Sequence, residues 1–284
     1  APPRNRSTHM LTEPPSPVQT QARDAAALQW NTLACGELDG DKARVDYFDR
    51  VAAERYRQQP WQHDYFGFDR FAGKDVLEIG IGQGTDLLQF AKAGARCHGV
   101  DITDNHLMLT QRNFALHGLA VDLHKADATA LPFADASLDC VYSFGVIHHI
   151  PEAERVIAEV RRVLKPGGEV MVAFYYQWSA FHLFQKLLLD GIGRAKLLRL
   201  GYAGLLATIE TGADGRRVKP YVKLYTKASM RRLFDAFDIE DVSIHQLSLD
   251  HFLPARLCGR MVHRQIPLAD RLGWYVSCRA RKPL

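Results

Sequence analysis

The chain has 284 residues, of which 47% are hydrophobic and 24% are charged, and its formal net charge is +4. These values are ordinary for a globular protein, and the length is enough for one large or two small domains with a sizeable core. The small net charge and the scattered basic residues argue against a nucleic-acid partner. No run of about 18 or more apolar residues occurs, so we expect no transmembrane helix and no stable membrane insertion.

The cysteines form neither a metal-binding pattern nor a disulfide framework. None is paired at C-x-x-C spacing, so we expect no metal site and no scaffold of disulfides. With no visible signal peptide, this usage fits a reducing compartment, and we predict a cytoplasmic location. The cysteines are Cys35, Cys97, Cys140, Cys258 and Cys278.

The N-terminal part of the chain divides into two segments. Residues 1–26 are rich in Pro, Ser, Thr and Gln without an apolar period, which predicts a disordered segment. Residues 27–73 become aromatic, and residues 46–57 have helical character, so we expect an N-terminal helical lid over the coming sheet. In this lid Tyr47 or Tyr56 would contact cofactor or substrate, although aromatic residues also simply fill cores.

Residues 76–86 are the most informative stretch of the sequence. The apolar run 76–79 predicts a buried strand, and Gly80, Gly82 and Gly84 follow at alternating positions. Apolar residues then recur at helical spacing over residues 87–91. A strand, a Gly-rich turn and a helix in this order are typical of a nucleotide-type cofactor site at the edge of a doubly wound sheet.

The glycine spacing bears on which cofactor binds. A dinucleotide fingerprint, G-x-G-x-x-G, counted from Gly80 would require glycine at the position of Thr85. The sequence therefore argues against NAD, although an NAD-dependent dehydrogenase stays open as an alternative function.

The second predicted strand, residues 96–100, ends at Asp101, which lies 21 residues after Gly80. In nucleotide-binding sheets an acidic residue about 20 positions after the turn accepts hydrogen bonds from ribose hydroxyls. We therefore predict that Asp101 binds ribose and that Ile102 packs on the adenine face. Thr103 or Asp104 is expected to cap the next helix.

The remaining strands follow from short apolar runs, and the helices between them from capping residues and proline. Pro151 is expected to open a helix that Pro166-Gly167-Gly168 ends, and Thr226 is expected to cap another. The third to seventh strands are predicted at residues 121–125, 138–143, 169–174, 239–249 and 274–280.

Several motifs stand in the order and spacing of one enzyme family. They are Glu78-x-Gly80-x-Gly82-x-Gly84, Asp101, Asp127, residues 139–149 and Leu164-Lys165-Pro166-Gly167-Gly168. Over residues 74–174 the chain resembles the class I S-adenosylmethionine (SAM)-dependent methyltransferases of the small-molecule type. It lacks the Asn/Asp-Pro-Pro-Tyr motif of enzymes that methylate amide or base nitrogens, since Ser143-Phe144-Gly145-Val146 stands there.

The resemblance implies a Rossmann-like α/β fold with a doubly wound, seven-stranded, mostly parallel sheet. Strand seven would be antiparallel beside strand five. SAM would be the cofactor and S-adenosylhomocysteine the product, with Asp127 accepting from the adenine amine. The implied cofactor-binding residues are Glu78, Gly80, Gly82, Gly84, Asp101, Ile102, Asp127, Ala128 and Ser143.

Residues 175–225 are too long for a tight connection between the fifth strand and its helix. We expect a helical cap insertion over an acceptor pocket, with Tyr175 and Tyr176 contacting the substrate. An amphipathic helix resting on a membrane or on a second subunit stays open as an alternative. Residues 226–284 would complete the sheet domain.

The resemblance and the aromatic content together predict transfer of a methyl group to an O, N or C atom of a small aromatic or lipophilic metabolite. A base for such an acceptor could be His148, His149 or His251, each of which could instead be structural. A SAM-binding cyclase or isomerase without methyl transfer is the first alternative. The acceptor and a homo-oligomeric state stay open.

Overall fold

A computed structural model describes residues 17–32, 34–209, 221–252 and 265–284. In these ranges seven strands form one sheet in the order β3-β2-β1-β4-β5-β7-β6. Strands β1 to β5 pair in parallel, and β7 pairs antiparallel with both β5 and β6. The strands are β1 (Asp75–Ile79), β2 (Arg96–Asp101), β3 (Asp122–Lys125), β4 (Leu138–Phe144), β5 (Leu164–Tyr175), β6 (Asp238–His245) and β7 (Tyr275–Arg281). The predicted fold class and the place of strand seven are confirmed.

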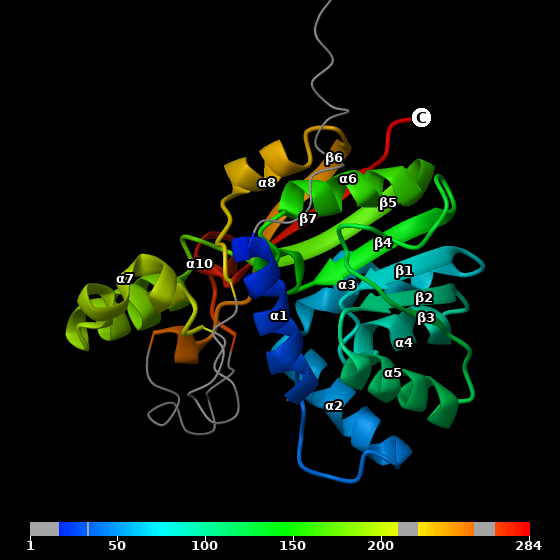
Figure 1. The fold of residues 1–284 in the computed structure, drawn as a ribbon, viewed down its shortest axis with the longest axis horizontal. Coiled ribbons are helices and arrows are strands. Elements are labelled where there is room, and N and C mark those ends of the chain that lie inside the picture. Colours follow the sequence, from blue (N-terminus) through cyan, green and yellow to red (C-terminus); the bar gives the residue numbers. More distant parts are fainter. Residues whose placement is uncertain (1–16, 33, 210–220, 253–264) are drawn as a thin grey trace, which may run out of the picture.

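Helices cover both faces of the sheet, with α6 and α8 on one face and α4 and α5 on the other (Figure 1). The longer helices are α1 (Pro17–Thr32), α2 (Val45–Gln58), α4 (Thr85–Lys92), α5 (Asp104–Leu116), α6 (Ala153–Val163), the π-helix η3 (Phe181–Gly193), α7 (Lys196–Leu206) and α8 (Lys227–Leu233). The shorter ones are α3 (Trp61–Phe66), η1 (Phe68–Phe71), η2 (Ile147–His149), η4 (Leu249–His251) and α10 (Ala269–Leu272).

The two faces of the sheet carry separate hydrophobic cores, because side chains alternate along each strand. In β1, Leu77 and Ile79 pack with Ile157 of α6, whereas Val76 packs with Phe90 of α4. A strand buried on both faces therefore reads as a continuous apolar run, which is why residues 76–79 were recognisable in the sequence.

The prediction that residues 1–26 are disordered is wrong for residues 17–26, because α1 begins at Pro17. Ala26 and Gln29 of this helix are buried. Arg23 pairs with Asp127 at 3.1 Å and with Glu152 at 2.8 Å. A few small or polar side chains hold this helix by contacts with distant residues. Its sequence therefore shows no apolar periodicity from which the helix could be predicted. Residues 1–16 lie outside the described part of the chain.

Some predicted element ends are also shifted. Strand β6 stops at His245 rather than residue 249, because Gln246 adopts a positive φ of 64° that a strand cannot continue. Helix α6 begins at Ala153 rather than Pro151. Strand β5 begins at Leu164, so Pro166-Gly167-Gly168 lies inside it, near an irregularity in the pairing with β4. Thr103 and Thr226 cap their helices as predicted.

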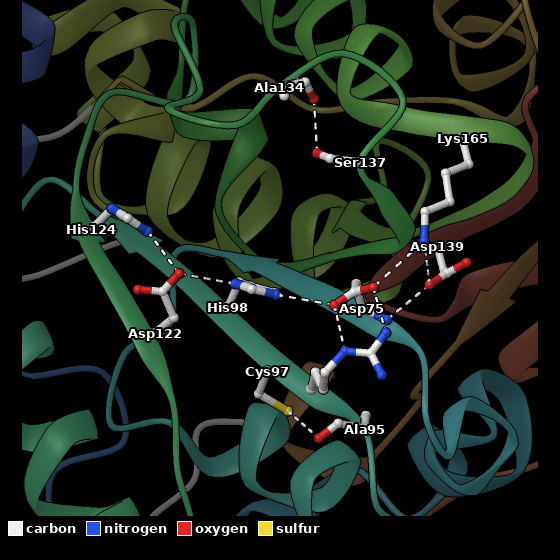
Figure 2. Close-up of polar contacts among 11 residues, drawn as sticks. Asp75, Ala95, Cys97, His98, Asp122, His124, Ala134, Ser137, Asp139 and Lys165 are labelled. Atoms are coloured by element: carbon white, nitrogen blue, oxygen red, sulfur yellow. Dashed lines mark hydrogen bonds and ion pairs between the residues drawn. The ribbon is translucent and has the colours of Figure 1, made fainter.

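A line of polar contacts joins the amino ends of neighbouring strands (Figure 2). Asp122 of β3 accepts from His98 of β2 at 3.1 Å, and the other ring nitrogen of His98 lies 3.5 Å from Asp75 of β1. The backbone N–H of Asp75 donates to Asp139 of β4, which also pairs with Lys165 of β5 at 2.8 Å. The contacts follow the order of the strands and tie one edge of the sheet together.

A buried carboxylate, Asp86, fixes the N-terminal helices to the sheet. It begins helix α4 and is 2% exposed. Arg55 of α2 forms a two-point ion pair with it, with 2.6 Å between Nε and Oδ1. The hydroxyls of Tyr56 and Tyr142 donate to the two carboxylate oxygens, each at 2.9 Å. Helices α2 and α4 and strand β4 thus meet at one side chain.

We predict that Asp86→Ala lowers the free energy of unfolding by about 3 kcal/mol or more, because it leaves a largely buried arginine without its counter-charge. Urea denaturation followed by circular dichroism measures this change. The control is Asp46→Ala, which removes an exposed partner of Arg44 and should leave the midpoint unchanged. Equal effects of the two substitutions would contradict the assignment.

Candidate active site

A cavity of about 360 Å³ opens at the carboxyl ends of the parallel strands. Its floor comes from residues that follow the strands: Glu78, Gly80 and Gly82 from β1, Asp101 and Ile102 from β2, Asp127 and Ala128 after β3, Phe144 and Gly145 from β4, and Tyr175 from β5. Its walls come from the N-terminal helices and from Tyr275 of β7. This is the edge at which open α/β sheets bind ligands.

The glycines of the turn after β1 are required by the backbone. Gly80, Gly82 and Gly84 have φ values of 76°, 55° and 73°, which side chains disfavour. A Cβ on Gly80 would lie 2.3 Å from Val146, and one on Gly84 would lie 2.7 Å from Thr110. At Gly82 no atom lies closer than 4.0 Å. Gly80 and Gly82 both line the cavity, whereas Gly84 packs against α5 outside it.

Asp101 stands at the cavity with its carboxylate already oriented. Oδ1 accepts from the backbone N–H and the hydroxyl of Thr103 at 2.9 and 2.8 Å. Oδ2 lies 3.0 Å from Nδ1 of His106, which also lines the cavity. Each carboxylate oxygen can accept more than one bond, so Asp101 is held in place and retains capacity for hydroxyl donors.

Asp127 reaches the cavity from the turn after β3. Its Oδ1 accepts from the backbone N–H and the hydroxyl of Thr129, at 2.8 and 2.7 Å. Its Oδ2 pairs with Arg23 of α1, so α1 closes this side of the cavity. Ile102 and Ala128 lie nearby as apolar lining residues.

Glu78 is a buried carboxyl group facing the cavity, and its Oε2 has no hydrogen-bond partner. Burial raises the pKa of Glu78 well above its usual range and the Asp86 carboxylate raises it further, whereas Arg55 lowers it. An orphaned acidic oxygen in a dry cavity is complementary to a cationic ligand group. The residues present therefore fit a positively charged nucleoside cofactor.

Seven predicted site residues do not line the cavity: Gly84, the histidines His148 and His251, and four residues with hydroxyl groups. The hydroxyl of Tyr47 donates to Gln83, and that of Tyr56 donates to Asp86. The hydroxyl of Ser143 donates to the carbonyl of Ile79 at 3.0 Å and joins β4 to β1. The fourth, Tyr176, forms a short β-bridge with Tyr225. Of the four predicted tyrosines, only Tyr175 lines the cavity.

The structure separates the three candidate histidines. His149 lines the cavity, and its Nδ1 lies 2.8 Å from the carbonyl oxygen of Tyr221. His148 is fully buried behind it, and burial lowers the pKa of its imidazole well below the usual range. His251 is buried in η4 and does not line the cavity.

Several lining residues gave no recognisable signal in the sequence. Arg23 lies in a segment predicted to be disordered, and Trp30 was one aromatic among many. Arg55 and Gln59 come from α2 and its end, and Tyr275 comes from the strand farthest along the chain. Only the contact between these elements, which is set by tertiary packing, could have identified them.

The predicted cap does not cover this cavity with its described helices. Helices η3 and α7 pack against each other, and no residue of either lines the cavity. In Figure 1, α7 lies at the far left, away from the parallel strands. Part of the predicted cap, residues 210–220, lies outside the described residues.

The described residues contain neither a metal-binding cluster nor a membrane-spanning helix. No group of three or more His, Cys, Asp or Glu side chains in them is arranged to hold a metal ion. None of their helices combines the length and the apolar character needed to cross a bilayer.

The part of the chain that forms most of the cavity floor is similar to known proteins. Residues 77–172 match a family model described as a methyltransferase domain. The chain is 34% identical over 125 residues to methyltransferase GfsG of Streptomyces halstedii, covering 43% of this chain and 44% of that protein. It is 36% identical over 98 residues to a sterol 4-C-methyltransferase of Caenorhabditis elegans, covering 34% and 29%. The matched part thus spans less than half of either relative.

A solved structure shares the fold over a greater length. The cyclase SpnF superposes with a TM-score of 0.54 at 19% identity and covers 94% of both chains. At this identity the likeness concerns the fold alone.

We predict that Glu78→Gln makes the protein more stable at pH 8, by about 1 kcal/mol or more. A carboxyl group whose folded-state pKa is raised holds its proton to a higher pH than it does in the unfolded chain. The wild-type free energy of unfolding therefore falls as pH rises above the ordinary glutamate pKa, and each tenfold change in proton affinity corresponds to about 1.4 kcal/mol. Urea denaturation at pH 5 and pH 8 measures it.

The control for this prediction is Glu154→Gln, which changes an exposed glutamate at the start of α6. It should shift stability equally little at both pH values. A Glu78→Gln variant that is less stable than wild type at pH 8 would contradict the prediction. It would show that Arg55 stabilises the Glu78 carboxylate more than burial and Asp86 destabilise it.

Proposed function

We propose that this chain, which belongs to the class I SAM-dependent methyltransferases, transfers a methyl group to a small aromatic or lipophilic acceptor. The observation that supports it best is that one cavity holds Glu78, the glycine turn, Asp101, and a histidine suited to accept a proton. When bound, SAM supplies an electrophilic methyl group on a positively charged sulfur.

Three groups of the floor would hold the cofactor. Asp101 would accept from the ribose hydroxyls, and Asp127 would receive the adenine amine. Glu78 would compensate a cationic group of the cofactor with its orphaned oxygen. Asp127 now pairs with Arg23, so we infer that the adenine shares or displaces that contact.

The other side of the cavity would hold the acceptor. Its lining includes the aromatic side chains of Phe144, Tyr175 and Tyr275 and the polar side chains of Arg55 and Gln59. The guanidinium of Arg55 lies 4.7 Å from the centre of the Phe144 ring, and its charge is directed to Asp86. Aromatic walls favour a flat or lipophilic molecule, in line with the sterol named for one relative.

His149 is the residue placed to accept a proton from the acceptor. Because Nδ1 faces the carbonyl oxygen of Tyr221, Nδ1 must carry the hydrogen, and the neutral ring has its lone pair on Nε2. Holding the acceptor and this base together in one cavity would lower the barrier to an in-line transfer.

A second candidate is a cyclase that uses the same cavity without methyl transfer, the activity named for SpnF, whose fold the chain shares. The two functions share the cofactor site and differ in the fate of the methyl group. Conversion of an acceptor without appearance of labelled methyl in the product would favour the cyclase.

We predict that calorimetry detects SAM and S-adenosylhomocysteine binding and that Asp101→Asn weakens both by about tenfold to a hundredfold, the cost of losing hydrogen bonds to a charged group. The control is Asp104→Asn, an exposed neighbour paired with Lys125. It should bind like wild type. Binding of NAD in place of SAM would overturn the proposal and favour a dehydrogenase.

We predict that His149→Gln lowers kcat by about a hundredfold or more if it removes a general base. The assay uses methyl-labelled SAM with a panel of phenolic and quinol acceptors over a range of pH. We expect wild-type kcat to rise with pH and this rise to disappear in the variant, while SAM binding persists. His124→Gln, at the opposite edge of the sheet, is the control and should keep wild-type kcat. A variant with an unchanged pH profile would exclude His149 as the base.

A further inference from the structure

The helix pair η3 and α7 exposes an unusual amount of apolar surface. Ile192 is 69% exposed and Leu198 is 91% exposed. Most monomeric proteins bury such side chains or scatter them, so a concentration on one pair of packed helices indicates an interaction site. We call the following six exposed residues the apolar cap surface: Phe184, Leu188, Leu189, Ile192, Leu198 and Leu200.

The polarity of η3 is inverted relative to a helix that faces water. His182, Lys186 and Asp190 recur every four residues and are buried. Leu188 and Ile192 follow the same spacing two positions on and are exposed. Residues four apart lie along one side of a helix, so the polar stripe faces inward and the apolar stripe faces outward.

The inward polar stripe is fully engaged with the protein. Lys186 donates to the carbonyl oxygen of Thr208 at 2.9 Å and lies 3.7 Å from Asp190. His182 lies 3.1 Å from the hydroxyl of Tyr202, which links η3 to α7. Because burying these groups is favourable only when they are paired, the network holds η3 in the orientation that presents its apolar side to the outside.

The exposed charged residues of segment 181–206 are basic. Residues 181–206 contain four basic residues and one acidic residue, a net charge of +3. The acidic residue, Asp190, is buried and pairs with Arg194 and Lys196. Arg194 and Arg199 are exposed at the surface itself.

We propose that the apolar cap surface docks on an anionic membrane surface, lying in the interface without crossing the bilayer. Exposed Leu, Ile and Phe side chains flanked by Arg and Lys are the chemistry of an interfacial helix, and anionic headgroups complement the net positive charge. A second copy of the chain fits less well, since a symmetric contact through this face would bring Arg194 and Arg199 of both copies together. The docking goes beyond the proposed methyl transfer, although a lipophilic acceptor would reside in the same phase.

The test is flotation of the full chain with vesicles of phosphatidylcholine, alone or mixed with phosphatidylglycerol. Wild type should bind the mixed vesicles, bind pure phosphatidylcholine more weakly, and lose affinity as salt is raised. The double variant Ile192→Ser/Leu198→Ser should bind at least about tenfold more weakly, because it removes the two most exposed apolar side chains of this surface. Arg199→Glu should weaken binding to the mixed vesicles only.

Met108→Ser is the matched control, since Met108 is 52% exposed on α5, outside the cap. It should bind vesicles like wild type. Equal binding by the double variant and wild type, or no binding to either vesicle, would overturn the proposal. A dimer that the double variant dissociates, with no vesicle binding, would assign the surface to a second copy instead.

The same variants separate this proposal from the proposed function. Because no residue of η3 or α7 lines the cavity, the double variant should retain SAM binding in calorimetry. Loss of vesicle binding with SAM binding intact therefore concerns the apolar cap surface alone. Absence of SAM binding in wild type concerns the proposed function and leaves the vesicle result unaffected.

Discussion

The carboxylate of Asp86 is almost fully buried, and a carboxylate in such surroundings is tolerated only when opposite charge and hydrogen-bond donors reach it. Its partners come from α2 and β4, which are far apart in the chain. Satisfying this one group therefore fixes α2 at the mouth of the cavity. The same Arg55 lowers the pKa of Glu78, which burial and Asp86 raise. The ion pair between Arg55 and Asp86 therefore orders α2 and also sets the electrostatics around Glu78 at the cavity floor.

The contacts that stabilise the sheet lie at the amino ends of its strands, and the cavity lies at their carboxyl ends. At the amino ends, ion pairs and histidine contacts connect β3, β2, β1, β4 and β5 in spatial order (Figure 2). At the carboxyl ends the strands finish in glycines and in carboxylates that are held by neighbouring hydroxyls, such as Asp101 by Thr103. Positive φ values and an unpaired carboxyl oxygen destabilise the fold at the carboxyl ends. The contacts between the strands at their amino ends offset this loss of stability.

Local spacing and the resemblance predicted residues that line the cavity floor, because Gly80, Asp101 and Asp127 each lie at or just after the end of a strand. They could not predict which way a side chain points near that edge. Ser143 and His148 stand in the right place along the chain, but both side chains are fully buried and do not line the cavity. Nor could they find Arg23, because α1 depends on ion pairs with residues more than a hundred positions away. The sheet order was predictable from the resemblance, whereas the walls of the cavity depend on packing between segments that carry no shared motif.

This division also limits what relatives can say about the acceptor. The match to a methyltransferase domain, residues 77–172, contains Glu78, Asp101, Asp127 and His149, so it covers most of the floor of the cavity. Trp30, Arg55, Gln59 and Tyr275 lie outside that range, and they form much of the wall that an acceptor would meet. This wall is tied to the glycine turn, because Tyr47 of α2 donates to Gln83 and Arg55 of α2 pairs with Asp86. The relatives therefore describe the floor of the cavity, whereas the shape of its walls follows from how α1, α2 and β7 pack in this chain.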